Sequence, residues 1–444
     1  MAVKLFGTDG IRGQFGHYPV VPDFFFRLAG AVESFFFQFF HKKYLKIAIG
    51  CDTRESGEVL VNALIAGFSS QIEVFKCGIL PTPALAYITR KLGCDCGLSV
   101  TASHNPYTDN GVKIFNVNGE KLSAKFERTI EDLVQISGTS GHTSSARVVD
   151  YGPTAGEAFC ALFSDVGFNF DGDVVLDVAN GAGTVTSPPI LRKICRNLTV
   201  IGDVPDGRNI NVGCGSENIA ALCRAVKEHG GAVGIAHDGD ADRLAMVDET
   251  AVPVDGDQIL GIVAKYLLAK NRLNNGIIVV TDQSNSGLDS SLGKIGIRVV
   301  RCDVGDRNVY HAMLEHGASF GGEESGHLIL REFFNTGDAI SAAVMVLRIM
   351  AETGRPLSSL KTDIPLLPKK LHSIQIGKKI PLGEIQGFDE LLNSLRKAEP
   401  GYGRVFARYS GTENKLRVLV EAKTAPIVDK ILTFVCEFLN HKLT

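Results

Sequence analysis

The stretch AVGIAHDGDADRLAMVD, residues Ala232–Asp248, contains the pattern that decides the fold. An apolar run of strand length precedes a loop with three aspartates, and a second apolar run follows it, so we expect strand, acidic loop and strand. Upstream, DVVLDVANGAG (Asp173–Gly183) predicts another strand, which ends in a glycine-rich turn before a helix. Apolar strands that alternate with helices are typical of α/β proteins built on parallel sheets.

The same alternation extends outward over about the first 350 residues of the chain. A charged helix is expected over 123–136. The segment SGTSGHTSSA (Ser137–Ala146) is small and polar, has no apolar period, and is the best candidate for a linker. After Pro365 the pattern changes to a strand, a helix over Leu382–Ala398, two strands and a last helix over Pro426–His441, which together predict a small α+β unit.

A chain of 444 residues is too long for one ordinary core. A prior of ~150 residues per domain suggests about three domains, and two or four are also admissible. From the pattern we predict an α/β fold in four domains. Three are α/β units, at 1–140, 150–250 and 251–365, and the fourth, at 366–444, is the smaller α+β unit.

The composition restricts the possible partners. Lys and Arg number 46 against 49 Asp and Glu, a formal net charge of −3, which argues against nucleic acid or an anionic membrane surface. The segment Phe24–Phe40 imitates a membrane helix, but it contains Arg27 and Glu33 and is shorter than the ~20 apolar residues of a span. Its apolar residues recur at helical spacing, so we expect a buried core helix and no membrane partner.

Ten cysteines occur without the spacing of a zinc site. The start of the sequence, MAVKLFGTDGIRG, lacks the basic and apolar regions of a signal peptide. We therefore expect reduced thiols and a cytoplasmic location.

The acidic loop carries the strongest chemical signal. Asp238, Asp240 and Asp242 alternate in a turn that leaves a strand, which directs three carboxylates towards one point, and such oxygen ligands suit Mg²⁺. Arg243 beside them suits a phosphate. The alternatives are a solvated acidic turn and an EF-hand loop. Glu249 stands at the twelfth EF-hand position, but the middle of that loop is a predicted strand and no helices flank it.

Four further loops carry polar residues after predicted strands or among glycines, and each alone is also consistent with an ordinary turn or hairpin. They are Phe6–Gly13 with Arg12, Thr101–Pro106 followed by Lys113, Gly321–His327, and Arg408–Glu413 followed by Arg417. Serine at the end of a strand is a candidate nucleophile if a base or a metal activates it. Two arginines with hydroxyls and a glycine indicate a phosphate site. One cleft shared by four domains explains all of these loops together.

The motifs FGTDGIRG, TASHNP, DGDADR, GGEESGH and RYSGTE, in this order and at these separations, resemble the α-D-phosphohexomutase superfamily over essentially the whole chain. The resemblance implies a heart-shaped protein of four domains, of which the first three share one α/β topology. It also implies a phosphoserine enzyme that uses one Mg²⁺.

Carried over by position, the resemblance assigns Ser103 as the phosphoserine. Asp238, Asp240 and Asp242 are the implied Mg²⁺ ligands, together with an oxygen of the phosphorylated Ser103. The residues implied around the transferring phosphoryl group are Arg12, His104, Lys113 and Arg243. The implied sugar-binding residues are Glu323 and Ser325, and the implied phosphate site comprises Arg408, Ser410, Gly411, Thr412 and Arg417. Asn414 departs from the pattern, because many relatives have proline there.

The implied reaction transfers the phosphoryl group of Ser103 to a hexose monophosphate, which gives a 1,6-bisphosphate. The sugar then reorients and returns its other phosphate to Ser103. FGTDGIRG and GGEESGH resemble the branch that interconverts glucosamine 6-phosphate and glucosamine 1-phosphate for cell-wall precursors, and a mannose or glucose phosphate is the alternative. A hydrolytic phosphatase and a non-catalytic sugar-phosphate sensor are the rival functions, and a homodimer stays open.

Overall fold

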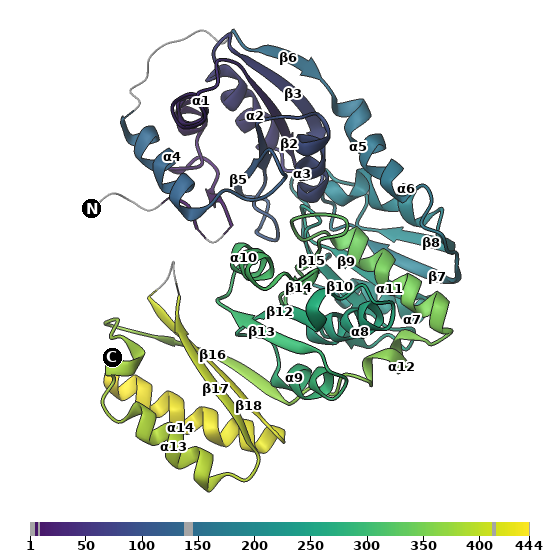
Figure 1. Ribbon diagram of the computed structural model, residues 1–444, viewed down its shortest axis with the longest axis vertical. Helices are drawn as coiled ribbons and strands as arrows, with labels where there is room; N and C mark the ends of the chain where they lie inside the picture. The colour runs from purple at the N-terminus through teal and green to yellow at the C-terminus, as the bar shows by residue number, and fades with distance from the viewer. Residues whose placement is uncertain (1–4, 8, 137–144, 411–413, 444) are drawn as a thin grey trace.

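The computed structural model describes residues 5–7, 9–136, 145–410 and 414–443. It contains four sheets, one in each successive part of the chain, as the colour order of Figure 1 shows. The first three parts lie against one another, and the C-terminal lobe extends from the third part at the lower left of the view. An α/β chain with a smaller α+β unit at its end was predicted, and this prediction is confirmed.

The first sheet has six strands in the order β1-β5-β4-β2-β3-β6. Its elements are β1 (Ile11–Gln14), α1 (Pro22–Phe40), β2 (Leu45–Cys51), α2 (Gly57–Ala66), β3 (Ile72–Ile79), α3 (Thr82–Lys91), β4 (Cys96–Val100), β5 (Asp109–Asn116), α4 (Ala124–Ile136) and β6 (Arg147–Asp150). The apolar faces of α1, α2 and α4 pack on one side of the sheet, whereas α3 and the next helix, α5 (Gly152–Cys160), pack on the other. Residues 137–144 of the expected linker lie outside the described residues, and β6 beyond them pairs with β3.

Helix α1 is the segment that imitates a membrane span. Proline at its first position suits a helix start, and the helix ends at His41, whose φ is 52°. Phe24, Phe25 and Phe35 are fully buried against the sheet, so the predicted core helix is confirmed. In the described part of the chain, we find no helix with the length and apolarity needed to cross a membrane.

The second sheet has the order β11-β10-β9-β7-β8 and the third has the order β13-β12-β14-β15. The second part comprises α5 (Gly152–Cys160), β7 (Phe170–Asp177), α6 (Ser187–Leu191), β8 (Cys195–Ile201), α7 (Ala220–Glu228), β9 (Val233–His237), β10 (Leu244–Val247) and β11 (Pro253–Val254). The third comprises α8 (Gly256–Ala269), β12 (Ile277–Thr281), α9 (Ser286–Gly293), β13 (Arg298–Cys302), α10 (Asp306–His316), β14 (Phe320–Gly322), β15 (Leu328–Leu330), α11 (Ala339–Thr353) and α12 (Leu357–Lys361). A capping box between Asp255 and Gln258 fixes the start of α8.

The C-terminal lobe has a three-stranded antiparallel sheet in the order β16-β18-β17, covered by two helices. Its elements are β16 (Lys369–Gln375), α13 (Phe388–Ala398), β17 (Tyr402–Tyr409), β18 (Lys415–Ala422) and α14 (Ala425–Leu443). The helix expected from Leu382 begins six residues later, because Gly387 has a φ of 87° that breaks the helical path.

The hydrophobic cores are distributed unevenly over these parts. One buried cluster runs through the first three parts, from Ala48 in β2 to Ile364 beyond α12. The C-terminal lobe has a core of its own, built only from residues between Ile374 and Leu443. The lobe joins the third part through polar contacts, in which Arg404 donates to the Asp282 carbonyl at 2.7 Å.

Candidate active site

Ser103 lies just beyond the carboxyl end of β4, in a loop that closes at β5. Its φ of 54° is a left-handed conformation that costs free energy in a residue other than glycine. The side chain is fully buried, and its Oγ donates to Oδ2 of Asp238 at 2.5 Å and lies 3.3 Å from Nδ1 of His104. The structure therefore holds the predicted nucleophile against the acidic loop.

The acidic loop connects the antiparallel strands β9 and β10 of the second sheet. Gly239 in this loop lies against the nucleophile loop, since a Cβ there would be only 2.6 Å from the carbonyl oxygen of Ser103. Thr82 at the start of α3 donates to Oδ2 of Asp240 at 2.6 Å. The loop is thus packed against the first part of the chain at several points.

The three aspartates fit a divalent cation. One carboxylate oxygen from each of Asp238, Asp240 and Asp242 lies within 4.8 Å of the others, and all three residues are buried. Oδ1 of Asp240 and Oδ1 of Asp242 are buried without a hydrogen-bond partner in the described part of the chain. Clustered hard oxygen ligands with unused lone pairs are what Mg²⁺ prefers.

Lys113 on β5 supplies positive charge to the same cluster. Its Nζ lies 2.7 Å from Oδ2 of Asp240, 2.6 Å from Oδ2 of Asp242 and 3.1 Å from Oδ2 of Asp9. Burial lowers the pKa of Lys113, but the three carboxylates outweigh it and raise this pKa well above its ordinary value. Lys113 therefore remains a cation and holds the pKa of Asp242 well below its usual range against the effect of burial.

Arg12 approaches the nucleophile loop from β1, which pairs with β5. Its Nη1 donates to the Ala102 carbonyl at 3.3 Å, and its guanidinium forms an ion pair with Asp9. Burial raises the pKa of Asp9, but Lys113, Lys121 and Arg12 together hold it well below its usual range. Arg12 is thus anchored to the backbone of the nucleophile loop, one residue before Ser103.

His104 and Arg243 complete the basic surroundings of Ser103. Burial, then Arg243 and Arg12, lower the pKa of His104 to about 4, so this imidazole is neutral at pH 7. Arg243 forms an ion pair with Glu217 at 3.0 Å. Burial lowers the pKa of Arg243, but Asp238 and other acidic neighbours raise it above its ordinary value. His104 thus supplies a neutral hydrogen-bond acceptor and Arg243 a fixed cation.

The glycine-rich loop between β14 and β15 carries Glu323 and Ser325. Glu323 is buried, its Oε1 accepts from the Gly305 N–H at 2.9 Å, and burial raises its pKa. Ser325 is exposed. The carbonyl of Gly326 accepts from the Leu244 N–H at 2.9 Å, so this loop is bound directly to the strand that follows the acidic loop.

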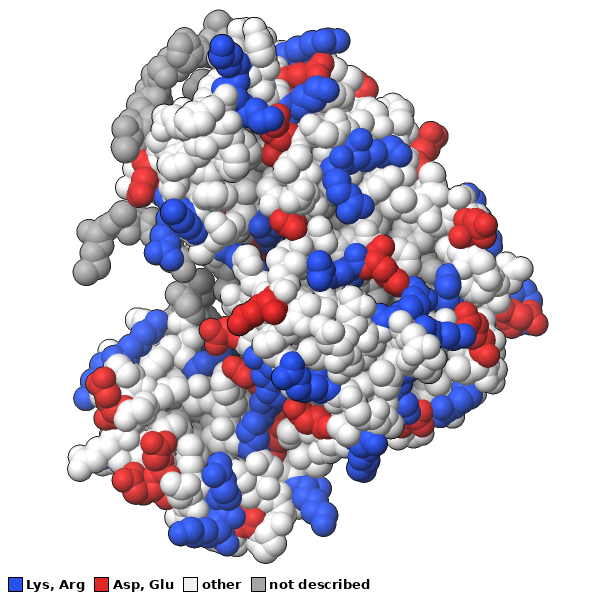
Figure 2. Space-filling model, viewed as in Figure 1, with Lys and Arg blue, Asp and Glu red and all other residues white. Residues whose placement is uncertain are grey.

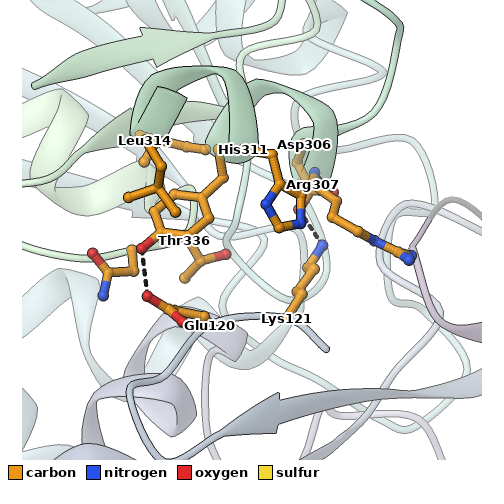
Figure 3. Close-up of a pocket in the computed structure, with 10 residues that line it drawn as sticks. Glu120, Lys121, Asp306, Arg307, His311, Leu314 and Thr336 are labelled. Atoms are coloured by element: carbon orange, nitrogen blue, oxygen red, sulfur yellow. Dashed lines mark hydrogen bonds and ion pairs between the residues drawn. The ribbon is translucent and has the colours of Figure 1, made fainter. Parts of the chain in front are cut away.

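Sequence reasoning assigned no role to His327, Asp306 or Lys121, which continue the charge pattern across the boundary between the first and third parts. His327 lies with Nδ1 3.7 Å from Oδ1 of Asp242 and Nε2 3.4 Å from Oδ2 of Asp306. Lys121 forms ion pairs with Asp306 and with Asp9. Figure 3 shows Lys121 reaching Asp306 beside a cavity of about 50 Å³. His327 stands in a quoted motif, but nothing in the sequence indicates its partners.

The C-terminal lobe brings two of the predicted phosphate ligands side by side. Arg408 on β17 is the register partner of Arg417 on β18. Burial, then Arg417, lower the pKa of Arg408, whereas Glu324 and Glu323 oppose this shift. The charges of the glycine-rich loop of the third part therefore influence Arg408, as does Arg417 on its own partner strand.

Ser410 follows β17 and is buried. Its carbonyl accepts from Nζ of Lys379 at 3.0 Å, and Lys379 is a further cation that no sequence motif indicates. Gly411 and Thr412 lie outside the described residues. Figure 2 shows the surface hollowed on its left side, where the C-terminal lobe meets the other parts.

Four family models match the chain in succession. They are phosphoglucomutase/phosphomannomutase alpha/beta/alpha domain I at residues 3–139, domain II at 164–251, domain III at 255–366 and the C-terminal domain at 382–438. A phosphoglucosamine mutase of Aliarcobacter butzleri (strain RM4018) is 38% identical over 453 residues, which cover 99% of this chain and 100% of the relative. Another phosphoglucosamine mutase, from Streptococcus pneumoniae (strain 70585), is 40% identical, and the match covers 99% of this chain and 99% of the relative.

Solved structures share the fold at lower identity. A phosphoglucomutase/phosphomannomutase family protein of Burkholderia thailandensis superposes with a TM-score of 0.81 at 21% identity, over 99% of this chain and 97% of the other. Aspergillus fumigatus N-acetylphosphoglucosamine mutase, in complex with GlcNAc-6P and magnesium, superposes with a TM-score of 0.68 at 19% identity. The superposition covers 100% of this chain and 96% of the other. Because the family models span most of the sequence in order and the curated relatives match it from end to end, the chain belongs to the phosphoglucomutase/phosphomannomutase family.

Proposed function

We propose that this enzyme is a phosphoglucosamine mutase, an isomerase that interconverts glucosamine 6-phosphate and glucosamine 1-phosphate. The observation that carries the mechanism is the buried Ser103 hydroxyl, which lies 2.5 Å from Asp238 at a cluster of three carboxylates. A serine held in this way is placed for phosphoryl transfer at a metal site. The substrate rests on relatives of 38% and 40% identity that are named phosphoglucosamine mutases.

The proposed reaction begins with Ser103 phosphorylated. Asp238, Asp240 and Asp242, with a phosphoserine oxygen, would hold Mg²⁺, which supplies charge that offsets the transferring phosphoryl group. Among the residues of the chain, Lys113 stays a cation beside that group, and neutral His104 is able to accept the proton of the attacking sugar hydroxyl.

Arg12 and Arg243 flank the same position, and we assign them to the phosphoryl oxygens. Transfer from Ser103 gives a 1,6-bisphosphate, and return of the other phosphate to Ser103 completes the isomerisation. An N-acetylphosphoglucosamine mutase of Aspergillus fumigatus has been solved with glucose 1,6-bisphosphate, which supports a bisphosphate of this class as the intermediate.

The C-terminal lobe is proposed to bind the phosphate that is not reacting. Paired Arg408 and Arg417, with Ser410, Gly411 and Thr412, provide the donors for either phosphate of the sugar. A reorienting bisphosphate requires such a fixed second site. All of these residues belong to the fourth of the proposed domains, which are 1–140, 150–250, 251–365 and 366–444.

Glu323 and Ser325 are proposed to contact the sugar ring. At pH 7 an amino sugar carries an ammonium group, and a charge-assisted hydrogen bond to a carboxylate contributes about 1.5–3 kcal/mol. Each glutamate of this loop has one oxygen that accepts a hydrogen bond, Oε1 of Glu323 from the Gly305 N–H at 2.9 Å and Oε2 of Glu324 from Thr281 Oγ1 at 3.1 Å. We take Glu323, which stands at the sugar-binding position implied by the motif, as our candidate for discrimination of the 2-amino group.

The test compares kcat/KM for the 1-phosphates of glucosamine, glucose, mannose and N-acetylglucosamine. We expect glucosamine 1-phosphate to be preferred at least about tenfold over glucose 1-phosphate, as a hydrogen bond of this strength implies. A preference for glucose or mannose would place the enzyme in the alternative branch with the same mechanism. Release of inorganic phosphate in place of the isomer would indicate the rival phosphatase.

We further infer that the enzyme works in the cytoplasm and supplies the synthesis of amino-sugar nucleotides and cell-wall precursors. All ten cysteines are free, which suits a reducing compartment. The homodimer stays a prediction that light scattering of the purified protein tests.

A further inference from the structure

Arg54 is a buried arginine of the first part of the chain, and none of the roles described above involves it. It lies in the turn after β2, and none of its side chain is exposed to solvent. Its Nε donates to Oδ2 of Asp52 at 2.9 Å, and the same oxygen accepts from Thr101 Oγ1 at 2.7 Å. A buried charge is costly unless it is paired and its donors are satisfied, so the partners of Arg54 indicate its role.

The remaining donors of Arg54 are directed at the loop that carries the nucleophile. Nη2 donates to the carbonyls of Ser103 at 2.9 Å and Asn105 at 2.8 Å. Nη1 donates to the carbonyl of Asp109 at 2.9 Å and to that of Pro106. A guanidinium presents its donors in a fixed planar fork, which an ammonium does not. One side chain therefore fixes four carbonyls between Ser103 and the first residue of β5, Asp109.

This turn requires support because Ser103 has a left-handed backbone. The Ser103 carbonyl accepts from Arg54 and also from Nδ2 of Asn211, at 2.9 Å, in the second part of the chain. We propose that Arg54 is a positioning residue for phosphoryl transfer. It holds the Ser103 backbone so that Oγ stays beside the acidic loop, and it does so without contacting the sugar phosphate; this inference rests on the function proposed above.

Two variants of Arg54 separate positioning from folding. Arg54→Lys keeps a cation beside Asp52 but replaces the fork with a single point of charge. The double variant Asp52→Asn/Arg54→Met removes both buried charges at once, so that neither is left unpaired. Arg208→Ala is the matched control, since Arg208 pairs with Glu55 at 2.7 Å in the neighbouring turn and its side chain is 68% exposed.

The readout is the phosphorylation of Ser103 by glucose 1,6-bisphosphate in a single turnover, followed by intact mass. We expect the rate of phosphorylation to fall about 100-fold in both Arg54 variants, because a nucleophile misplaced by about 1 Å costs a factor of this size. The rate in Arg208→Ala should be unchanged. In steady state kcat should fall by a similar factor while KM stays within about twofold, because Arg54 does not contact substrate. Circular dichroism and thermal unfolding check the fold of each variant.

Wild-type protein that takes up no phosphate on Ser103 would reject the proposed function itself. If the wild type is phosphorylated, a folded Arg54→Lys that reacts at a similar rate would overturn the positioning role. An effect confined to KM would also overturn it, because Arg54 would then act on substrate binding. Loss of the fold in both variants would assign Arg54 to the stability of the first sheet and overturn the proposal as well.

Discussion

Gly239→Ala tests whether the close approach of the acidic loop to the nucleophile loop matters for catalysis. An alanine Cβ at this position would lie 2.6 Å from the carbonyl oxygen of Ser103 and 2.7 Å from Cδ1 of Ile210. Ordinary van der Waals contact begins at 3.4 Å, so the acidic loop and the Ser103 backbone must separate by the difference, about 0.8 Å. Gly239 lies between Asp238 and Asp240, so a shift of either loop changes the position of the nucleophile relative to the three aspartates.

A displacement near 1 Å costs about 100-fold in rate when the reacting atoms must be aligned. We therefore expect kcat of Gly239→Ala to fall about 30- to 100-fold, and KM to stay within about twofold because the residues proposed to bind the substrate are intact. Overpacking at a buried contact should reduce the free energy of unfolding by about 1–3 kcal/mol. Steady-state kinetics and thermal unfolding of the same preparation measure both effects.

Gly30→Ala is the control for this substitution. Gly30 lies within α1 and has no atom within 4 Å of the position its Cβ would take, so alanine should leave activity unchanged. It should stabilise the helix by roughly 0.5–1 kcal/mol. Wild-type kcat in a folded Gly239→Ala would refute the reasoning, because the two loops would then have room to separate without moving the reacting atoms.

Three further outcomes are expected. Ser103→Ala should fold but lose nearly all mutase activity, and intact mass should show a phosphate on part of the wild type and none on the variant; full activity would remove the covalent mechanism. Asp240→Asn should weaken Mg²⁺ binding. A bound ligand stabilises the folded protein by about 2.7 kcal/mol at 100 times Kd, so Mg²⁺ should raise the unfolding temperature of the variant less than that of the wild type. An equal rise would contradict the metal site. Burial raises the pKa of Glu127 from 4.5 to about 7, although the charge of Arg307 acts to lower it. The stability that this carboxyl contributes is therefore complete below pH 4.5 and is lost as the pH rises through 7. The stability of the wild type relative to Glu127→Gln should therefore decrease over that interval in urea titrations, and a constant difference would show that the carboxyl titrates normally.

The sequence predicted those features that depend on local pattern. The buried α1, the strand that precedes the acidic loop and the last helix all follow from apolar period, and α14 (Ala425–Leu443) matches the expected 426–441 closely. The three clustered carboxylates follow from their alternation in one loop. In these cases neighbours in sequence are also neighbours in space.

The contacts that pattern did not predict join segments far apart in the chain. Arg54 meets the nucleophile loop 49 residues later, and Lys121 meets Asp306 185 residues later. A lone arginine or lysine in a polar turn is usually solvated, and only the packing of the sheets buries these two. The start of α13 was predicted six residues too early for a different reason, because composition does not determine whether Gly387 adopts a positive φ.

The separate core of the C-terminal lobe affects how the protein unfolds. One buried cluster extends through the first three parts, and the first part adds a second cluster around α1, whereas the lobe contributes to neither and is joined to the third part by polar contacts. Cooperative unfolding follows shared apolar burial, so the lobe forms a melting unit of its own. Calorimetry should then resolve two transitions. A sugar bisphosphate that bridges the lobe and the other three parts would merge the two transitions into one. A heating curve would then report whether both phosphate sites are occupied at once.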